Sequence, residues 1–385
     1  MRRATIILSL ILLAFSFVYI NHAVNDEKNM EQKRPNSLGK LYFIPQRDLI
    51  VAVCGSVPNG SIRFWSINDG KLMETLDLGK GVWADSMAVS NSGNLVAIAL
   101  FPKNETMCYT VPEKKLLWNV KWLEKGIVDN AMRFTPDDRK LVAVGFKNIV
   151  TYDAETGTLL ERQEDSKGFS GGFPRYRTRN NAISPSARYA AFWKGNLEHD
   201  EGWWSSKNIW VVVRDIETRK TISKQGKIQE KYKNCSAVFT RDDDNVVLGS
   251  MDGHVRVWSI KEQRISREWQ AFWDDKPSPF EKNPAPNNIN SMLFSREGQY
   301  LATMGFDIKS RFAIRIWEYS SNKLIHEFTD VISSSLGMCS GYPMAFSLDG
   351  KYFALEQQGQ LCLYDTQNWE EKWCVLSWPE DNRMK

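Results

Sequence analysis

The 385-residue sequence predicts an all-β fold, a seven-bladed β-propeller of four-stranded antiparallel blades that follows an N-terminal export segment. The first observation is a pattern that occurs seven times: an apolar residue, usually Phe, then a Ser or Thr, turn residues and an apolar run. The second is the spacing of the copies, which lies between 45 and 56 residues. Repeats of roughly 40–50 residues are typical of propellers, arrays and solenoids, and strand-like copies favour the propeller. The apolar anchors are Phe43, Val89, Phe134, Ile183, Phe239, Phe294 and Phe346.

The fifth copy shows most clearly how one blade is built from four strands, here called a to d in chain order. Val255 and Val257 alternate with polar or larger residues, which is the pattern of a strand. Asp252-Gly253 ahead of them supports a turn, because Gly accepts a positive φ. We expect every a strand to begin near its anchor, and the ring to close by packing between blades one and seven without a shared strand. The predicted strands of blade five are Ser236–Thr240, Val246–Ser250, His254–Ile260 and Arg264–Trp269.

The N-terminus differs in kind from the repeats. Arg2 and Arg3 precede 17 uncharged residues, and the small residue Ala23 follows, an order typical of an export signal. We therefore expect an exported protein that begins between Ala23 and Asn29, with no membrane span after cleavage. An uncleaved membrane anchor is the alternative, although 17 residues is at the short limit for a span. The predicted domains are 1–23 signal peptide or anchor, 24–40 polar linker, 41–378 propeller and 379–385 C-terminal tail.

The sequence contains six cysteines, which in an oxidising compartment allow three disulfides. Cys362 is expected on strand c of blade seven and Cys374 on strand d, across a short turn. Opposed residues on adjacent antiparallel strands are close enough for a disulfide, so this pair is a candidate disulfide. The alternative is that all six cysteines are small buried apolar residues. The sequence lacks a C-x-x-C-H motif, which excludes covalently attached haem in this chain.

The long connections all belong to one face of the predicted disc, formed by the b–c and d–a links. Their ranges are Asp165–Thr178, Lys194–Asn208, Gln270–Ile289 and Phe306–Arg311. Aromatic residues and Arg, which are enriched at protein interfaces, are frequent there, so we expect protein partners to bind this face. The alternative is that the loops cover their own blades. The predicted partner-binding residues are Phe173, Arg175, Tyr176, Trp203, Trp204, Phe272, Trp273 and Phe280.

The sequence offers no catalytic residue, metal ligand or cofactor-binding residue that a known motif supports, because G-x-S-x-G, P-loop and dinucleotide patterns are absent. A net charge of +4 over 385 residues gives no footprint for nucleic acid. Two function classes remain: a non-catalytic scaffold of an exported complex, or a metal-assisted lactonase or lyase acting at the central channel. A ring of polar residues at the starts of the a strands could hold the metal ion that the second class needs. The alternative is that these residues cap the backbone. These residues are Asp85, Asn130, Asn180, Asn234 and Asn290.

Short dipeptides close strand c in six of the seven copies. They are Trp65-Ser66, Tyr152-Asp153, Arg214-Asp215, Trp258-Ser259, Trp317-Glu318 and Tyr364-Asp365. Over residues 41–376 the chain thereby resembles the WD-repeat (WD40-like) propeller family, whose strand c ends in Trp-Asp. The resemblance implies the fold and not an activity. The chain departs from the family in lacking its Gly-His dipeptide, which puts the family's Asp-His-Ser/Thr-Trp hydrogen-bond network in doubt.

The whole chain is also similar to the propeller (beta) subunits of hydrazine synthase from anammox bacteria. The similarity rests on the layout: an export segment, one seven-bladed propeller, no haem motif and aromatic loops on one face. It implies partner subunits that carry haem and join nitric oxide and ammonium into hydrazine, in the lumen of the anammoxosome. No cofactor is implied in this chain.

Overall fold

The structure is a computed structural model that describes residues 38–54, 59–101, 103–122, 131–145, 148–164, 181–200, 203–224, 234–250, 252–272, 289–306, 312–329, 331 and 343–377. These residues belong to one compact unit, Ser37–Lys385. Within them, no helix has the length and apolar character needed to cross a membrane. The predicted signal segment lies outside the described residues.

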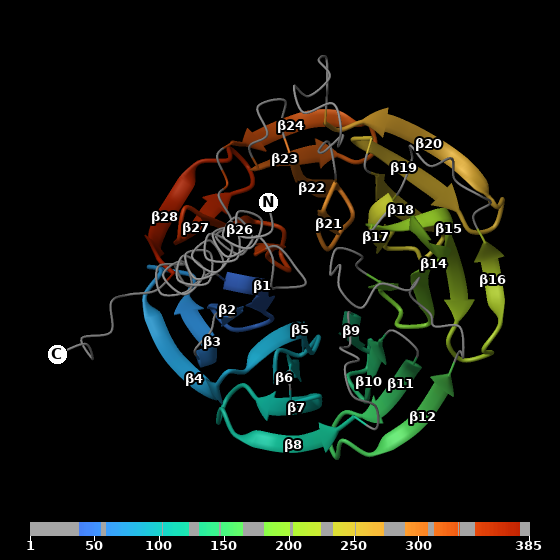
Figure 1. The fold of residues 1–385 in the computed structure, drawn as a ribbon. Coiled ribbons are helices and arrows are strands. Elements are labelled where there is room, and N and C mark those ends of the chain that lie inside the picture. Colours follow the sequence, from blue (N-terminus) through green and yellow to red (C-terminus); the bar gives the residue numbers. More distant parts are fainter. Residues whose placement is uncertain are drawn as a thin grey trace, which may run out of the picture. The chain divides into compact units, whose positions relative to one another are not determined.

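Seven antiparallel sheets, each of four strands that follow one another in the chain, form a ring (Figure 1). The prediction of an all-β, seven-bladed propeller is confirmed. Blade one contains β1 (Leu38–Ile44), β2 (Leu49–Cys54), β3 (Asn59–Ser66) and β4 (Leu72–Lys80). Blade two contains β5 (Trp83–Val89), β6 (Leu95–Phe101), β7 (Glu105–Thr110) and β8 (Leu116–Lys121). Blade three contains β9 (Ala131–Phe134), β10 (Lys140–Val144), β11 (Asn148–Asp153) and β12 (Leu159–Glu164).

The remaining four blades continue the same order around the ring. Blade four contains β13 (Ala182–Ile183), β14 (Tyr189–Asp200), β15 (Trp203–Asp215) and β16 (Thr221–Lys224). Blade five contains β17 (Asn234–Phe239), β18 (Asn245–Ser250), β19 (His254–Ser259) and β20 (Arg264–Gln270). Blade six contains β21 (Ser291–Phe294), β22 (Tyr300–Phe306), β23 (Phe312–Glu318) and β24 (Lys323–Phe328). Blade seven contains β25 (Met344–Phe346), β26 (Tyr352–Gln357), β27 (Gln360–Asp365) and β28 (Glu371–Leu376).

The anchors lie at or next to the ends of the a strands, so the prediction that each a strand begins near its anchor is wrong, whereas the four strands predicted for blade five are confirmed to within two residues. Val89 ends β5 and Phe346 ends β25, for example. The Ser or Thr after the anchor explains this position. The Ser347 side-chain oxygen accepts a hydrogen bond from the Tyr352 backbone N–H at 2.9 Å, and the Ser347 N–H donates to the Tyr352 carbonyl at 2.8 Å. The same side-chain bond, spanning five residues, recurs in blades two to seven and closes each a–b turn.

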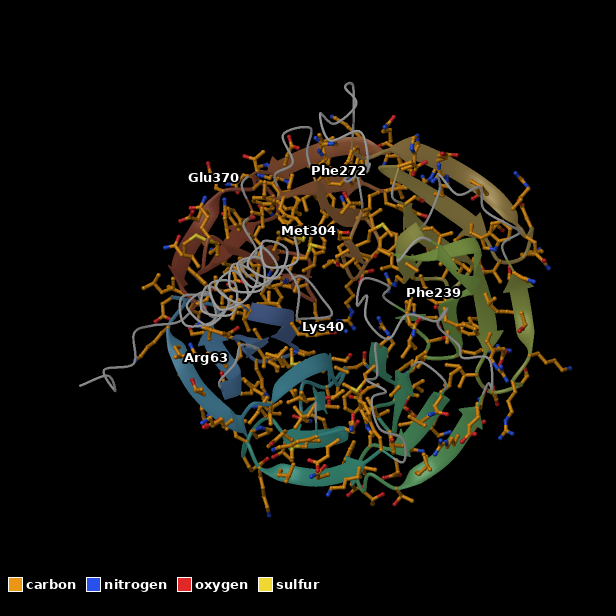
Figure 2. All side chains as sticks on the ribbon, in the orientation of Figure 1. Lys40, Arg63, Phe239, Phe272, Met304 and Glu370 are labelled. Carbon is orange, nitrogen blue, oxygen red and sulfur yellow. A yellow bond between two sulfur atoms is a disulfide. The ribbon has the colours of Figure 1, made fainter. Side chains whose placement is uncertain are left out.

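The hydrophobic core consists of seven clusters, and each lies between two neighbouring blades. Ile62 of blade one, for example, packs in one cluster with Met87 of blade two. Phe239, Phe272 and Met304 belong to three different clusters (Figure 2). Because no blade buries its apolar faces alone, each blade depends on both of its neighbours.

The seam between blades seven and one closes the ring without a shared strand in the described residues. Its apolar cluster combines Trp65 of β3 with Leu361 and Leu363 of β27, all with 0% exposure. The Leu38 backbone N–H donates to Oε2 of Glu356 at 3.0 Å, and Leu38 is itself fully buried. Residues 38–40 are therefore part of β1, which starts three residues before the predicted start of the propeller at residue 41.

A Trp–Gly contact joins neighbouring blades at two equivalent places. A Cβ atom on Gly70, in the c–d turn of blade one, would lie 2.8 Å from Trp373 Cε3 of β28. A Cβ on Gly157 would lie 2.7 Å from Trp118 Cδ2 of β8. Trp373 Nε1 donates to the Ile67 carbonyl at 2.7 Å, and Trp118 Nε1 to the Ala154 carbonyl at 2.9 Å. The contact between Gly70 and Trp373 lies on the seam between blades one and seven.

The cysteines differ in state. Cys362 and Cys374 are directly opposed on β27 and β28, with Cα atoms 4.1 Å apart, and they form a disulfide. Cys108 is a free, fully buried thiol, and burial raises the pKa of Cys108 to about 12. The side chains of Cys54, Cys235 and Cys339 lie outside the described part of the chain.

We predict that Gly70→Ala destabilises the protein more than Gly350→Ala. Both glycines have a positive φ, +70° and +71°, so both variants carry the same backbone strain. A Cβ on Gly350 meets nothing within 4 Å, whereas a Cβ on Gly70 collides with Trp373. Overpacking adds about 1–3 kcal/mol to the destabilisation of Gly70→Ala. Urea unfolding of both variants measures the difference, and equal midpoints with equal slopes would contradict the role given to the Trp373 contact.

Candidate functional site

Blade four carries the most extended feature on the face of the b–c and d–a links. β14 has 12 residues and β15 has 13, whereas no other described strand exceeds nine. The two strands pair to their ends, with Asp200 opposite Trp203 and His199 opposite Trp204. The segment Lys194–Asn208, expected to be a loop, is thus a β-hairpin with one register irregularity between Lys194 and Asn196. The ladder gives this hairpin a fixed backbone that a loop would lack.

The predicted partner-binding residues have different outcomes. Phe272 has 0% exposure, packs between blades five and six, and has the Arg315 guanidinium 4.7 Å from its ring centre. Its prediction as an interface residue is wrong, because its backbone N–H bonds to the Gly253 carbonyl and turns the ring into the core. The backbones of Trp203 and Trp204 lie in β15. Their side chains and the whole of Phe173, Arg175, Tyr176, Trp273 and Phe280 lie outside the described residues, so they stay predictions.

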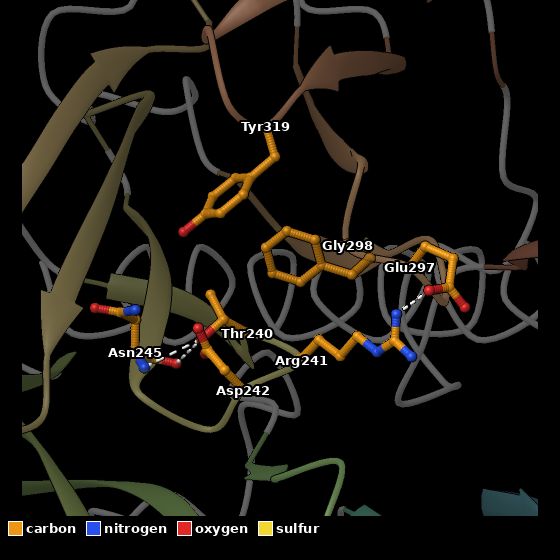
Figure 3. A pocket seen from close by; sticks show the side chains of 8 residues that line it. Thr240, Arg241, Asp242, Asn245, Glu297, Gly298 and Tyr319 are labelled. Carbon is orange, nitrogen blue, oxygen red and sulfur yellow. Dashed lines mark hydrogen bonds and ion pairs between the residues drawn. The ribbon is translucent and has the colours of Figure 1, made fainter.

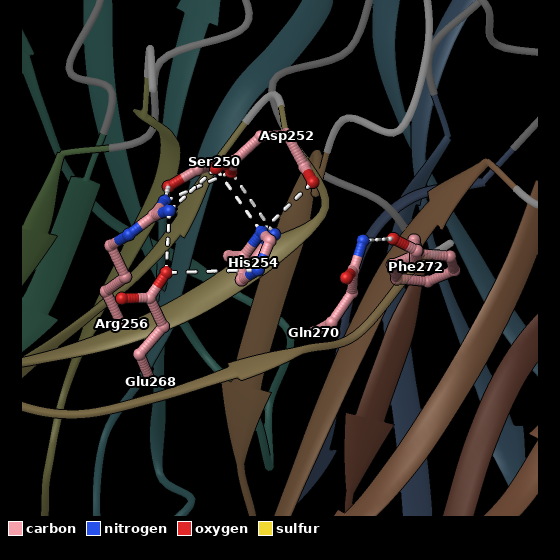
Figure 4. A network of polar contacts seen from close by, with 7 residues as sticks. All are labelled: Ser250, Asp252, His254, Arg256, Glu268, Gln270 and Phe272. Atoms are coloured by element: carbon pink, nitrogen blue, oxygen red, sulfur yellow. Dashed lines mark hydrogen bonds and ion pairs between the residues drawn. The ribbon is translucent and has the colours of Figure 1, made fainter. Parts of the chain in front are cut away.

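A charged network fixes the b–c turn of blade five on the same face (Figure 4). The Arg256 side chain is 7% exposed and donates to both carboxylate oxygens of Asp252, at 3.0 and 2.6 Å. It also bonds Ser250 Oγ at 2.8 Å and contacts Glu268 Oε1 at 2.8 Å. His254 Nδ1 lies 3.3 Å from Asp252 Oδ2. A guanidinium held between two carboxylates is already satisfied, so this network positions the turn and offers no free acid or base.

Glu356 is the buried acid that stands out at the ring-closing seam. It is 1% exposed on β26, and one of its oxygens accepts the Leu38 N–H. Burial raises the pKa of Glu356 to about 8, and the hydrogen bonds from the Leu38 N–H and the Ser377 side chain work in the opposite direction. Arg63 of β3 donates to the Ser377 carbonyl at 2.9 Å. At neutral pH the Glu356 carboxyl therefore stays largely protonated.

A shallow pocket of about 460 Å³ lies between the a–b turns of blades five and six (Figure 3). Phe294 and Tyr319 meet edge to face in it, with ring centres 4.8 Å apart. Arg241 and Glu297 form an ion pair at its border, and Thr240 Oγ1 donates to Asp242 at 2.5 Å. The two acids that line the pocket, Asp242 and Glu297, are thus engaged in a turn contact and an ion pair.

Of the five residues expected at the channel mouth, Asn290 has a described side chain. Asn290 is 8% exposed, and its backbone N–H donates to the Met304 carbonyl at 2.8 Å. The side chains of Asp85 and Asn234, and the residues Asn130 and Asn180, lie outside the described part. Within that part, no three His, Cys, Asp or Glu side chains are grouped so that they could hold a metal ion. A cation at the mouth stays a prediction.

Residues 226–259 match the family described as WD domain, G-beta repeat. The match spans strands a to c of blade five and includes the Asp252–Arg256 pair. Together, this match and the seven-bladed ring support the WD-repeat propeller family. Protein HIR1 of Yarrowia lipolytica (strain CLIB 122 / E 150) is 31% identical over 108 residues. These residues make up 25% of this chain and 10% of that protein, so the chain spans about a tenth of that relative's length.

The tryptophans at the end of strand c form hydrogen bonds in more than one way. Trp317 Nε1 donates to Thr303 Oγ1 in the neighbouring strand of its own blade, at 2.9 Å. Trp258 Nε1 instead donates to Ser223 Oγ on β16 of the preceding blade, also at 2.9 Å. The missing Gly-His dipeptide therefore does not leave the blades unlinked, because other donors connect them.

We predict that Glu356→Gln removes a pH dependence of stability. The folded-state pKa of about 8 lies above the ordinary Glu value, so the folded protein keeps a proton that the unfolded chain releases. The free energy of unfolding of the wild type should therefore fall between about pH 4.5 and pH 8, by up to about 1.4 kcal/mol per pH unit from this group. Urea unfolding at pH 5, 7 and 9 should show the variant gaining relative stability as pH rises. A wild-type-to-variant difference that is constant over this range would contradict the assignment.

Proposed function

We propose that this WD-repeat chain is a non-catalytic propeller scaffold that binds other protein subunits through the face of its b–c and d–a links. The observation that carries the proposal is the blade-four hairpin, whose strands of 12 and 13 residues exceed every other described strand. A rigid ring that presents an ordered hairpin is suited to recognition, because little conformational entropy is lost on binding. The charged groups described on the same face are held in structural pairs, which supports binding over catalysis.

The hairpin gives the most direct test. Asn196 and Lys207 are paired, so residues 197–206 can be replaced by an Asn-Gly turn while the ladder below stays intact. We expect this variant to keep its urea midpoint and to lose its protein partner in copurification from the native source. Trp203→Ala/Trp204→Ala keeps the hairpin and should weaken binding by about 30- to 1000-fold if these rings are anchors. A shortened variant that folds and retains every partner would place the interface elsewhere.

We further propose that the protein acts after export across a membrane. The Cys362–Cys374 disulfide supports this, because structural disulfides persist mainly in oxidising compartments. Edman sequencing of the native protein should give a start between Ala23 and Asn29, and thiol labelling should leave this pair unmodified without reductant. An intact Met1 on membrane-bound material would favour the uncleaved anchor instead.

The finer form of the proposal is the propeller subunit of a hydrazine synthase-like complex in an anammoxosome lumen. Its support is the similarity of layout over the whole chain. The chain itself would hold no cofactor, and partner subunits would supply the haem chemistry. Native purification tests this form: haem absorbance should follow the partner subunits and disappear when they are separated from this chain. Stoichiometric metal in the separated chain would favour the channel lactonase or lyase.

A further inference from the structure

The a strands border the centre of the ring, and one position on them carries a charge in blade three alone (Figure 1). In every blade this position lies one residue before the anchor, opposite a b-strand residue that packs against the next blade. Uncharged residues serve six blades there, so the fold does not require the charge. In blade order the residues are Tyr42, Ala88, Arg133, Ala182, Val238, Leu293 and Ala345.

The Arg133 side chain is exposed although β9 is the innermost strand of its blade (Figure 1). Its partner on β10, Val142, packs in the cluster between blades three and four, so Arg133 lies at the inner end of that seam. Within the described residues, no hydrogen bond or ion pair holds the Arg133 guanidinium. The solvent that this side chain meets therefore fills the centre of the ring, and its donors are available to a ligand.

Two groups from other blades lie close enough to interact electrostatically with Arg133: Tyr42 of β1 and Asp243 in the a–b turn of blade five. Burial lowers the pKa of Arg133, while Tyr42 and Asp243 raise it. Burial raises the pKa of Tyr42, so its hydroxyl keeps its proton at neutral pH. The Asp243 carboxylate accepts a hydrogen bond from Ser186 Oγ instead of forming an ion pair with Arg133. Groups from blades one, three and five thus converge at the a–b turn end of the central channel.

These surroundings favour one class of ligand. A guanidinium binds a carboxylate through two parallel hydrogen bonds. Ala88 and Ala182 occupy the equivalent position in the two neighbouring blades, and such short side chains leave room beside Arg133. Val238 and Leu293 are partly exposed at the same position farther round, so an apolar ligand body would meet apolar side chains. The nearby Asp243 charge disfavours a second negative charge, which argues against a dianion such as phosphate.

We propose that Arg133 binds a small monocarboxylate with an apolar body at the a–b turn end of the central channel. The Arg133 guanidinium holds the carboxylate, and the Tyr42 hydroxyl is a further donor at the same end. Lys40, another cation of the a strands, lies near the start of β1 and is engaged with Ser86 Oγ at 3.0 Å (Figure 2). The site is at the opposite end of the channel from the face of the b–c and d–a links, so it does not depend on the proposed function.

Saturation-transfer NMR titrations of the full chain test the ligand class with three probes: isobutyrate, its neutral counterpart isobutyramide, and inorganic phosphate. Isobutyrate should bind with a dissociation constant of about 1 mM, which is reasonable for so small a ligand. Isobutyramide has the same shape and no charge, so it should bind at least about tenfold more weakly. Phosphate should also bind more weakly than isobutyrate. A wild type that does not bind isobutyrate, or that binds isobutyramide or phosphate equally well, would overturn the proposal.

Three variants test the residues, with urea midpoints to confirm that each one folds. Arg133→Gln should weaken isobutyrate binding at least about tenfold, because the charged donor is lost. Arg139→Gln is the matched control: Arg139 is exposed in the a–b turn of the same blade, and the change in net charge is the same. Asp243→Asn should strengthen binding about threefold, because a repelling charge is removed while Asn accepts the φ of +63°. Equal weakening by Arg133→Gln and Arg139→Gln would mean that isobutyrate responds to net charge alone, which would overturn the site.

Discussion

The contact between blades seven and one is the constraint on which the ring depends. Six of the seven apolar clusters join blades that follow each other in the chain, but the seventh joins segments about 300 residues apart, as the 306-residue separation of Trp373 and Ile67 shows. Closing a loop of that length costs about 5 kcal/mol of chain entropy. Five large apolar side chains of this cluster have 0% exposure, and each contributes about 1.5–3 kcal/mol. Apolar burial at the seam therefore outweighs the loss of chain entropy on ring closure. The contacts of Trp373 with Gly70 and Ile67 fix how blade seven packs against blade one.

The blades repeat one local device and differ where they meet other molecules. The Ser or Thr after each anchor closes an a–b turn in six blades, and the c–d bulge recurs in all seven. The features that are not shared are the blade-four hairpin and the Asp252–Arg256 pair. Differences between blades carry no benefit for a symmetric ring, so they are the natural places to seek function. Both of these features belong to b–c links and therefore lie on the same face of the ring.

Blade number and blade order could be predicted from the sequence, because the anchor and the following Ser or Thr form a local pattern with a local hydrogen bond. The same locality made Cys362 and Cys374 recognisable as a pair. The blade-four hairpin and the burial of Phe272 could not be predicted, because each depends on the residues that pair with it or pack against it in the folded ring. Segment Lys194–Asn208 has a polar composition typical of a loop, although its two strands pair in the structure. Phe272 follows a strand, and the sequence does not indicate that its N–H bonds to the Gly253 carbonyl. The roles of the loop aromatics depend on partners, about which a single sequence contains little information.

Hydrogen exchange followed by mass spectrometry on Trp373→Ala tests the central claim most directly, because it reports local opening strand by strand. If blade seven and blade one are held together by the seam, amide protection should fall together in β1–β4 and in β25–β28. β13–β16 of blade four, on the far side of the ring (Figure 1), should keep protection close to that of the wild type. Loss of protection confined to β28 would contradict the account, since it would mean that Trp373 stabilises only its own strand.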